Sequence, residues 1–336
     1  MEATQIILNP GAARQRLGRL WQHCQREVLR ELAPAEAVIV ESPQEAAQTA
    51  RDSALGGYFR LVVVGDAPTA NGVVNGLMGL AESHRARMKL GFLSLYRPDE
   101  WSRTTDFPRR LERQLEVLRA AHTLRFDVGV MRRGGGRDAR VRHFLNGCVF
   151  GAPNPLWHGR PGSWLDLRAA ADTVRAAGQA LFAQAPVVRI EDAGGTVYEG
   201  PWVLGLAMVG RYYPLLGEVA PEADPMDGLL DLVWLDARAR WRVWRDMAGL
   251  ALHRLPAGRR HACGERFRIA SLDGPLALDL DGAPGETLPA ELSVLPGALP
   301  IIVPLVSVQQ RRPRFKSLPE LAKGAALGDP NIAAVA

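Results

Sequence analysis

Short apolar runs alternate with amphipathic stretches over the first third of the chain. Four runs are rich in valine, isoleucine and leucine, which is typical of buried parallel strands: residues 5–8, 37–40, 61–64 and 89–95. Apolar residues recur at helical spacing in the intervening stretches: residues 12–32, 42–55, the segment after Thr69, and 108–122. Ser42 followed by Pro43 is a typical helix start, with Ser42 as the N-cap. This alternation predicts an α/β domain with a mostly parallel sheet and helices on both faces.

After about residue 123 the pattern changes to many short runs separated by glycine-containing turns, which predicts an antiparallel sheet or sandwich. The predicted strands are residues 123–131, 141–149, 187–191, 196–199, 203–209, 229–235, 267–270, 276–280 and 292–295. Two further helices are predicted at residues 163–184 and 241–255. The predicted organisation is an α/β domain at residues 1–124, an antiparallel β-sandwich-like domain at residues 125–300, and a return segment with a C-terminal tail at residues 301–336.

Composition narrows the function classes. The 336 residues are 47% apolar and 23% charged, and no apolar run approaches the ~18 residues of a membrane span. The N-terminus lacks signal-peptide features and the three cysteines lie far apart, so we expect a cytoplasmic protein without a disulfide framework. The net charge of +5 favours an anionic membrane surface, reached peripherally from the cytoplasm, or a phosphorylated ligand. Nucleic acid is not expected, because few aromatics lie between the basic residues. The oligomeric state stays open.

One stretch combines a strand, a tight turn and a helix start. The strand at residues 61–64 is followed by the turn Gly65-Asp-Ala-Pro68, and Thr69 is the predicted N-cap of the next helix. Such a unit directs backbone N–H groups and a helix dipole at one point, where anions bind in many α/β proteins. The same unit is also ordinary building material that binds nothing.

Several motifs occur in a characteristic order: Ile6-Ile-Leu-Asn-Pro10, Val73-Val-Asn-Gly-Leu77, Phe144-Leu-Asn-Gly147, Gly210-Arg-Tyr-Tyr213, Asp227-Gly-Leu-Leu-Asp231, Asp281-Gly282 and Leu299-Pro-Ile-Ile-Val-Pro304. In this order they resemble the diacylglycerol kinase catalytic-domain superfamily, which includes bacterial lipid kinases, sphingosine kinases and ceramide kinases. The resemblance covers about residues 5–304. It implies ATP- and Mg²⁺-dependent phosphoryl transfer to a lipid hydroxyl, in diacylglycerol, ceramide or a related lipid, at a cleft between the domains.

The resemblance also implies roles for individual residues. Asp281 matches the family's catalytic base. The structural Mg²⁺ would be held by hard oxygen ligands: Asp224, Asp227 and the backbone carbonyl of Leu229. The nucleotide would contact Asn9, Gly65, Asp66, Thr69, Asn71 and Arg97. From the residues alone, Asp281-Gly282 is equally a hairpin turn, and the segment around Asp227 is equally a solvated acidic turn.

The glycine-rich loops depart from the family. The family's Gly-Gly-Asp-Gly-Thr turn is Gly65-Asp-Ala-Pro-Thr69 here, so Pro68 replaces a glycine and removes an N–H. Its Gly-Thr-Gly-Asn-Asp-Phe-Ala loop is Tyr96-Arg-Pro-Asp-Glu-Trp-Ser102. Three functions stay open: a lipid kinase whose altered pocket uses Arg97 or Arg14 for charge, a pseudokinase that binds a lipid without phosphorylating it, and a scaffold or interaction protein.

Overall fold

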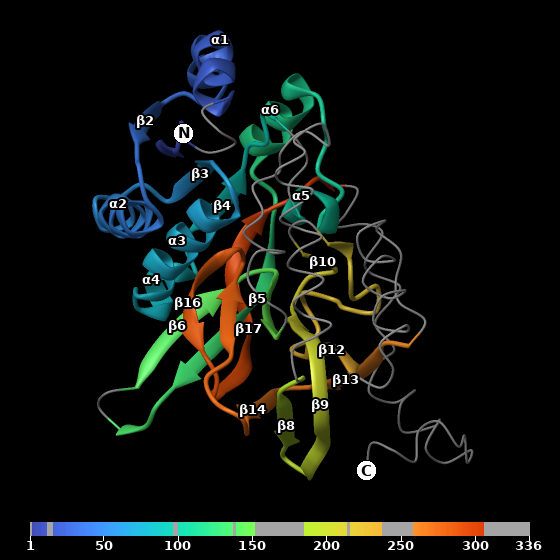
Figure 1. The fold of residues 1–336 in the computed structure, drawn as a ribbon. Coiled ribbons are helices and arrows are strands. Elements are labelled where there is room, and N and C mark those ends of the chain that lie inside the picture. The colour runs from blue at the N-terminus through green and yellow to red at the C-terminus, as the bar shows by residue number, and fades with distance from the viewer. Residues whose placement is uncertain are drawn as a thin grey trace, which may run out of the picture.

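A computed structural model describes residues 2–11, 16–96, 100–136, 139–151, 185–213, 216–236 and 258–305 (Figure 1). The N-terminal part is built on parallel strands in the order β2–β1–β3–β4. These strands are β1 (Thr4–Leu8), β2 (Ala35–Ile39), β3 (Arg60–Val64) and β4 (Lys89–Phe92). The helices are α1 (Arg16–Glu31), α2 (Pro43–Leu55), α3 (Ala67–Met78), α4 (Glu82–Arg85), α5 (Glu100–Thr104) and α6 (Leu111–Ala120).

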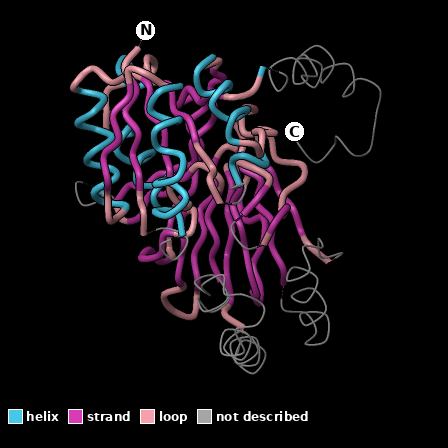
Figure 2. Tube along the Cα trace, turned by 90° about the horizontal axis from the view of Figure 1, so that it is seen from above, coloured by secondary structure: helices cyan, strands magenta, loops and turns pink. Residues whose placement is uncertain are grey.

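Successive residues of the central strands enter two different cores. Ile7 and Val63 pack with residues of α2 and α3, whereas Ile6 and Val62 pack with residues of α1 and α6. Side chains alternate between the two faces of a strand, so helices on both faces account for the nearly continuous apolar runs in the sequence. Figure 2 shows these helices gathered at one end of the strand system. The predicted α/β part is confirmed.

The second part is antiparallel, as predicted. Its strands are β5 (Thr123–Arg133), β6 (Arg140–Phe144), β7 (Gly147–Gly151), β8 (Val187–Asp192), β9 (Gly195–Met208), β10 (Tyr212–Tyr213), β11 (Gly217–Glu218), β12 (Leu230–Asp236), β13 (Arg260–Gly264), β14 (Arg266–Ser271), β15 (Ala277–Leu280), β16 (Ala283–Thr287) and β17 (Ala290–Ile302). The long strand β17 pairs antiparallel with β5 and β14 and then parallel with β4. It thereby joins the two parts into one 15-stranded sheet within the described residues.

Several strand predictions were wrong in their limits. The predicted strand 141–149 is two strands, β6 and β7, because the N–H groups of Leu145 and Asn146 turn away from the ladder toward a buried carboxylate. The predicted strands 196–199 and 203–209 are parts of β9, and 292–295 is the middle of β17, whose register shifts after Leu295. The predicted helices 163–184 and 241–255 and the tail lie outside the described residues. The domain boundaries stay a prediction. No helix of the described part is long and apolar enough to cross a membrane.

Candidate functional site

The N-terminus of α3 already holds a carboxylate of the chain itself. Asp66 is the N-cap, and its Oδ1 accepts hydrogen bonds from the N–H of Thr69 at 3.1 Å and from its Oγ1 at 2.6 Å. The predicted N-cap, Thr69, was therefore wrong: both residue types can cap a helix, and Pro68 fits the first turn, so the helix starts earlier. Thr69 Oγ1 also accepts from the side-chain amide of Asn9 at 2.9 Å. Asn9, Asp66 and Thr69 thus form one network at the predicted nucleotide site.

Few backbone donors at this helix end remain for an external anion. Pro68 has no N–H and the N–H of Thr69 is donated to Asp66, which leaves that of Ala67 in the first three residues of α3. Gly65 is required for packing, since a Cβ there would lie 2.8 Å from the Cβ of Thr69. The helix dipole that could attract a phosphate is therefore paired with Asp66.

Asp281 lies at the turn between β15 and β16, with φ of 50°, and is only 2% exposed. Its Oδ2 accepts from the N–H of Leu145 at 2.6 Å and from Asn71 Nδ2 at 3.0 Å. Its Oδ1 accepts from the N–H groups of Asn146 at 2.9 Å and Gly147 at 3.0 Å. Burial raises the pKa of Asp281, and these hydrogen bonds oppose that rise. The carboxylate accepts about as many hydrogen bonds as its lone pairs allow.

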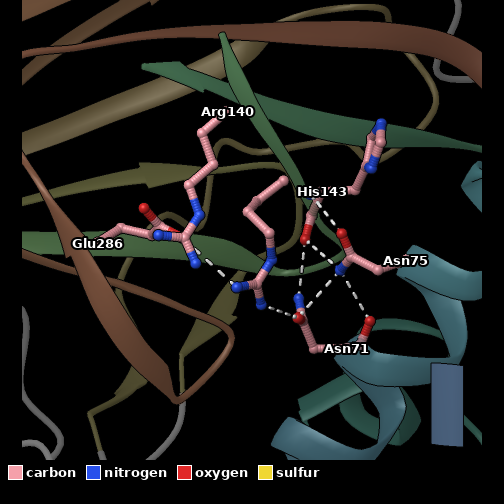
Figure 3. Close-up of polar contacts among 6 residues, drawn as sticks. Asn71, Asn75, Arg140, His143 and Glu286 are labelled. Atoms are coloured by element: carbon pink, nitrogen blue, oxygen red, sulfur yellow. Dashed lines mark hydrogen bonds and ion pairs between the residues drawn. The ribbon is translucent and has the colours of Figure 1, made fainter. Parts of the chain in front are cut away.

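Helix α3 is fastened to β6 by two asparagines (Figure 3). Asn71 Nδ2 donates to the carbonyl of His143 at 2.8 Å, and Asn75 both donates to that carbonyl at 3.0 Å and accepts from the His143 N–H at 2.9 Å. Arg142 donates to Asn71 Oδ1 at 3.4 Å and lies 3.5 Å from Glu286. Burial, with the charges of Arg85 and Arg142, lowers the pKa of His143 to about 4, so its imidazole is neutral. Asn71 therefore connects the candidate base to the junction of the two parts.

A small cavity of about 30 Å³ lies where these groups meet. It is lined by Val63, Gly65, Asp66, Ala67, Ala70, Asn71, Phe92, Glu100, Trp101, Leu145, Asn146 and Asp281. Three of the lining residues are acidic and none is basic, within the described part of the chain. Two atoms of lining residues, Trp101 Nε1 and Asn146 Oδ1, are buried without a hydrogen-bond partner among the described atoms. A Cβ placed on Gly282 would lie 3.7 Å from Pro68 Cδ, so the two turns nearly touch beside this cavity.

The predicted metal loop presents carboxylates close together. Asp227 Oδ1 accepts from the Leu229 N–H at 2.9 Å, and Asp224 Oδ1 is buried without a hydrogen-bond partner. Asp127 on β5 holds the loop by accepting from the Gly228 N–H at 2.7 Å. Desolvation and the neighbouring carboxylates raise the pKa of Asp227 to about 6. No cluster of three or more metal-binding side chains is found among the described residues, so a cation here would also need the carbonyl and water.

The sequence did not indicate every residue of this region. Asn75, Arg142, His143, Glu286 and Asp127 received no role, although Asn75 lies in the matched Val73-to-Leu77 motif and could have been noticed there. The others are brought to the site by strand pairing between distant segments. Arg97 lies outside the described residues.

Comparisons with known proteins agree with this architecture. Residues 4–131 match the family model of the diacylglycerol kinase catalytic domain. The structure is similar to that of a diacylglycerol kinase from Bacillus anthracis str. Sterne, with a TM-score of 0.64 and 17% identity over 91% of this chain and 98% of that chain. A second structure from the same organism gives 0.70 at 18% identity over the same shares.

An NAD kinase from Archaeoglobus fulgidus in complex with ATP gives a TM-score of 0.52 and 11% identity over 93% of this chain and 97% of that chain. A search of the curated proteins finds no match. At these identities the structural neighbours establish the fold alone.

Proposed function

We propose that the chain, whose residues 4–131 match the family model of the diacylglycerol kinase catalytic domain, is a pseudokinase that binds a lipid and does not transfer phosphate from ATP. The observation that carries the proposal is the carboxylate of Asp66 at the N-terminus of α3. A phosphate at that helix end would have to displace Asp66 from two hydrogen bonds to Thr69. Two anions cannot share one helix terminus without strong repulsion.

The surroundings of the cavity support the same proposal. Its acidic residues include Asp66 and Asp281, whose carboxylates repel a polyphosphate, and its described lining contains no basic side chain. Its volume of about 30 Å³ is far below the roughly 300–1,000 Å³ of ordinary ligand pockets. The described lining of this cavity therefore does not fit the nucleotide that the family implies.

Asp281 is better suited to holding the structure than to taking a proton. A general base needs a lone pair directed at the hydroxyl that it deprotonates. Each oxygen of Asp281 already accepts from two donors, contributed by Asn71 of α3 and by the backbone of the segment 145–147, where β7 begins. We assign Asp281 the role of joining α3 to that segment.

A lipid remains the proposed ligand because the family acts on lipids. The indole N–H of Trp101 and the side-chain Oδ1 of Asn146, which lack partners among the described atoms, are the donor and the acceptor that a lipid hydroxyl group would need. The metal loop fits a divalent cation: Asp224 offers a buried unpartnered oxygen, and Asp227 and the Leu229 carbonyl complete a hard-oxygen set. A cation there would neutralise the carboxylates and stiffen the loop, and Asp127 would keep the loop in place through Gly228.

A lipid kinase is the second candidate, because Asp281 does line the cavity beside α3, where a base for a lipid hydroxyl would be required. The two functions are separated by one pair of measurements on the purified chain. Extraction and mass spectrometry report bound lipid, and incubation with labelled ATP, Mg²⁺ and diacylglycerol or ceramide reports transfer. We expect bound lipid and no labelled product. Labelled lipid would establish the kinase, and neither lipid nor label would favour a scaffold.

A further inference from the structure

The hairpin formed by β5 and β6 concentrates the positive charge of the chain. Residues 131–143 contain five arginines and one aspartate, a formal charge of +4, compared with +5 for the whole chain. Four of these arginines lie in the described part, and no described residue of the stretch is acidic: Arg132, Arg133, Arg140 and Arg142. We call these four residues with Val141 the arginine hairpin.

The hairpin's position leaves its outer end accessible. Strand β6 pairs only with β5 among the described strands, so it is an edge. Its inner end packs on α3 through Asn75 and His143, while the other end extends away from the helices toward the lower left of Figure 1. Val141 is 37% exposed between two arginines. The hairpin thus presents charge and an apolar side chain at one border of the molecule.

The charges of the hairpin are only partly balanced. Arg133 lies directly opposite Arg140 in the strand pairing, an arrangement of like charges that destabilises a sheet. Buried Glu286 lies 3.1 Å from Arg140 and 3.5 Å from Arg142, so one carboxylate serves both. Arg132 faces Glu291. An external anion would relieve this repulsion.

Glu291 offers Arg132 little compensation. It already pairs with two arginines of β14, Arg266 at 3.7 Å and Arg268 at 3.2 Å. Within the described residues no carboxylate forms an ion pair with Arg132 or Arg133. The excess positive charge therefore extends from the hairpin across the neighbouring strands.

We propose that the arginine hairpin docks the chain on an anionic lipid surface. The proposal rests on the lipid ligand of the proposed function, which such a surface would supply. The stretch 131–143 contains no aromatic residue on which a base could stack, and its exposed Val141 suits the boundary between headgroups and acyl chains. Duplex nucleic acid is accordingly treated as an outcome of the test.

The test is co-sedimentation of the full chain with phosphatidylcholine vesicles, with and without phosphatidylglycerol. The variant is Arg132→Gln with Arg133→Gln, chosen because the hydrogen bonds that fasten α3 to β6 come from other residues, Asn71, Asn75, Arg142 and His143. The matched control is Arg19→Gln with Arg26→Gln, two exposed arginines on α1 at the other end of Figure 1. Both variants lose the same charge.

We expect binding to the anionic vesicles alone, a loss of about 30-fold in the hairpin variant, and little change in the control. High salt should abolish binding, because it screens surface charges. Equal losses in both variants, no vesicle binding by the natural chain, or tighter binding to duplex DNA would each overturn the proposal. Lipid extracted from the natural chain distinguishes the two proposals: if that lipid is absent while vesicle binding still depends on the hairpin, only the proposed function fails.

Discussion

Replacing Asp281 by asparagine tests whether this residue holds the structure together. Each carboxylate oxygen accepts two hydrogen bonds, one pair from Leu145 and Asn71, the other from Asn146 and Gly147. An asparagine offers one oxygen, so in either orientation its NH₂ group faces two donors. Two buried donors without an acceptor cost roughly 1–3 kcal/mol each, about 4 kcal/mol together.

Removing the buried charge recovers part of that loss, because burial raises the pKa of Asp281 and therefore disfavours its charged form. We expect Asp281→Asn to lower the free energy of unfolding by about 3 kcal/mol, a large share of the roughly 5–15 kcal/mol of a typical domain. Urea unfolding followed by circular dichroism measures the change, with the slope checked for constancy.

The matched control is Asp52→Asn. Asp52 is exposed on α2, where it accepts from Gln48 at 2.9 and 3.0 Å, so its replacement should change stability by less than about 0.5 kcal/mol. If Asp281→Asn proves as stable as the control, the structural role is refuted. Lost phosphoryl transfer at unchanged stability would identify Asp281 as a base.

Three further expectations concern packing, titration and metal. Gly76→Ala should lower the free energy of unfolding by about 2 kcal/mol, since its Cβ would lie 2.1 Å from the carbonyl oxygen of Ala47, whereas Gly135→Ala has no atom within 4 Å and should be near neutral. NMR should show the His143 imidazole titrating near pH 4; because this pKa lies below the ordinary 6.5, its contribution to stability is complete above pH 6.5 and is lost as the pH falls toward 4. Mg²⁺ should raise the thermal midpoint of the natural chain and not that of Asp224→Asn.

Each of these three predictions would be contradicted by a specific result. Equal stability of the two glycine variants would mean that α2 and α3 pack less closely than described. A His143 titration near pH 6.5 would place its ring in water. An equal response to Mg²⁺ in Asp224→Asn would exclude this aspartate as a ligand.

Local sequence predicted the helices and strands well where the spacing of apolar residues fits only one type of element. The valine-rich runs are parallel strands, and Ser42 caps α2 by accepting from the N–H of Glu45 at 3.1 Å. The predicted strand limits were wrong where a residue distant in sequence accepts backbone hydrogen bonds that the strand pairing would otherwise use. Leu145 and Asn146 leave the predicted strand because their N–H groups bind Asp281, more than 130 residues away in sequence.

The sequence predicted which residues lie together at the site, but it did not predict the hydrogen bonds between them. Asn9, Asp66 and Thr69 were all expected at one place, and the structure does bring them together. Their hydrogen bonds to one another, in place of donors left for a phosphate, depend on the side-chain direction of Asp66. That direction follows from the position of Asp66 as the N-cap of α3, with Pro68 in the first turn of the helix. The sequence had predicted a later start, with Thr69 as the N-cap.

Calorimetric titration with ATP and Mg²⁺ measures directly whether this chain binds the nucleotide. The natural chain is compared with a variant that restores the family turn, Asp66→Gly, Ala67→Asp and Pro68→Gly, thereby removing the capping carboxylate and returning a backbone N–H at position 68. We predict no saturable heat for the natural chain and saturable binding for the restored turn. Saturable binding of ATP by the natural chain would contradict the proposal that Asp66 excludes the nucleotide from the N-terminus of α3.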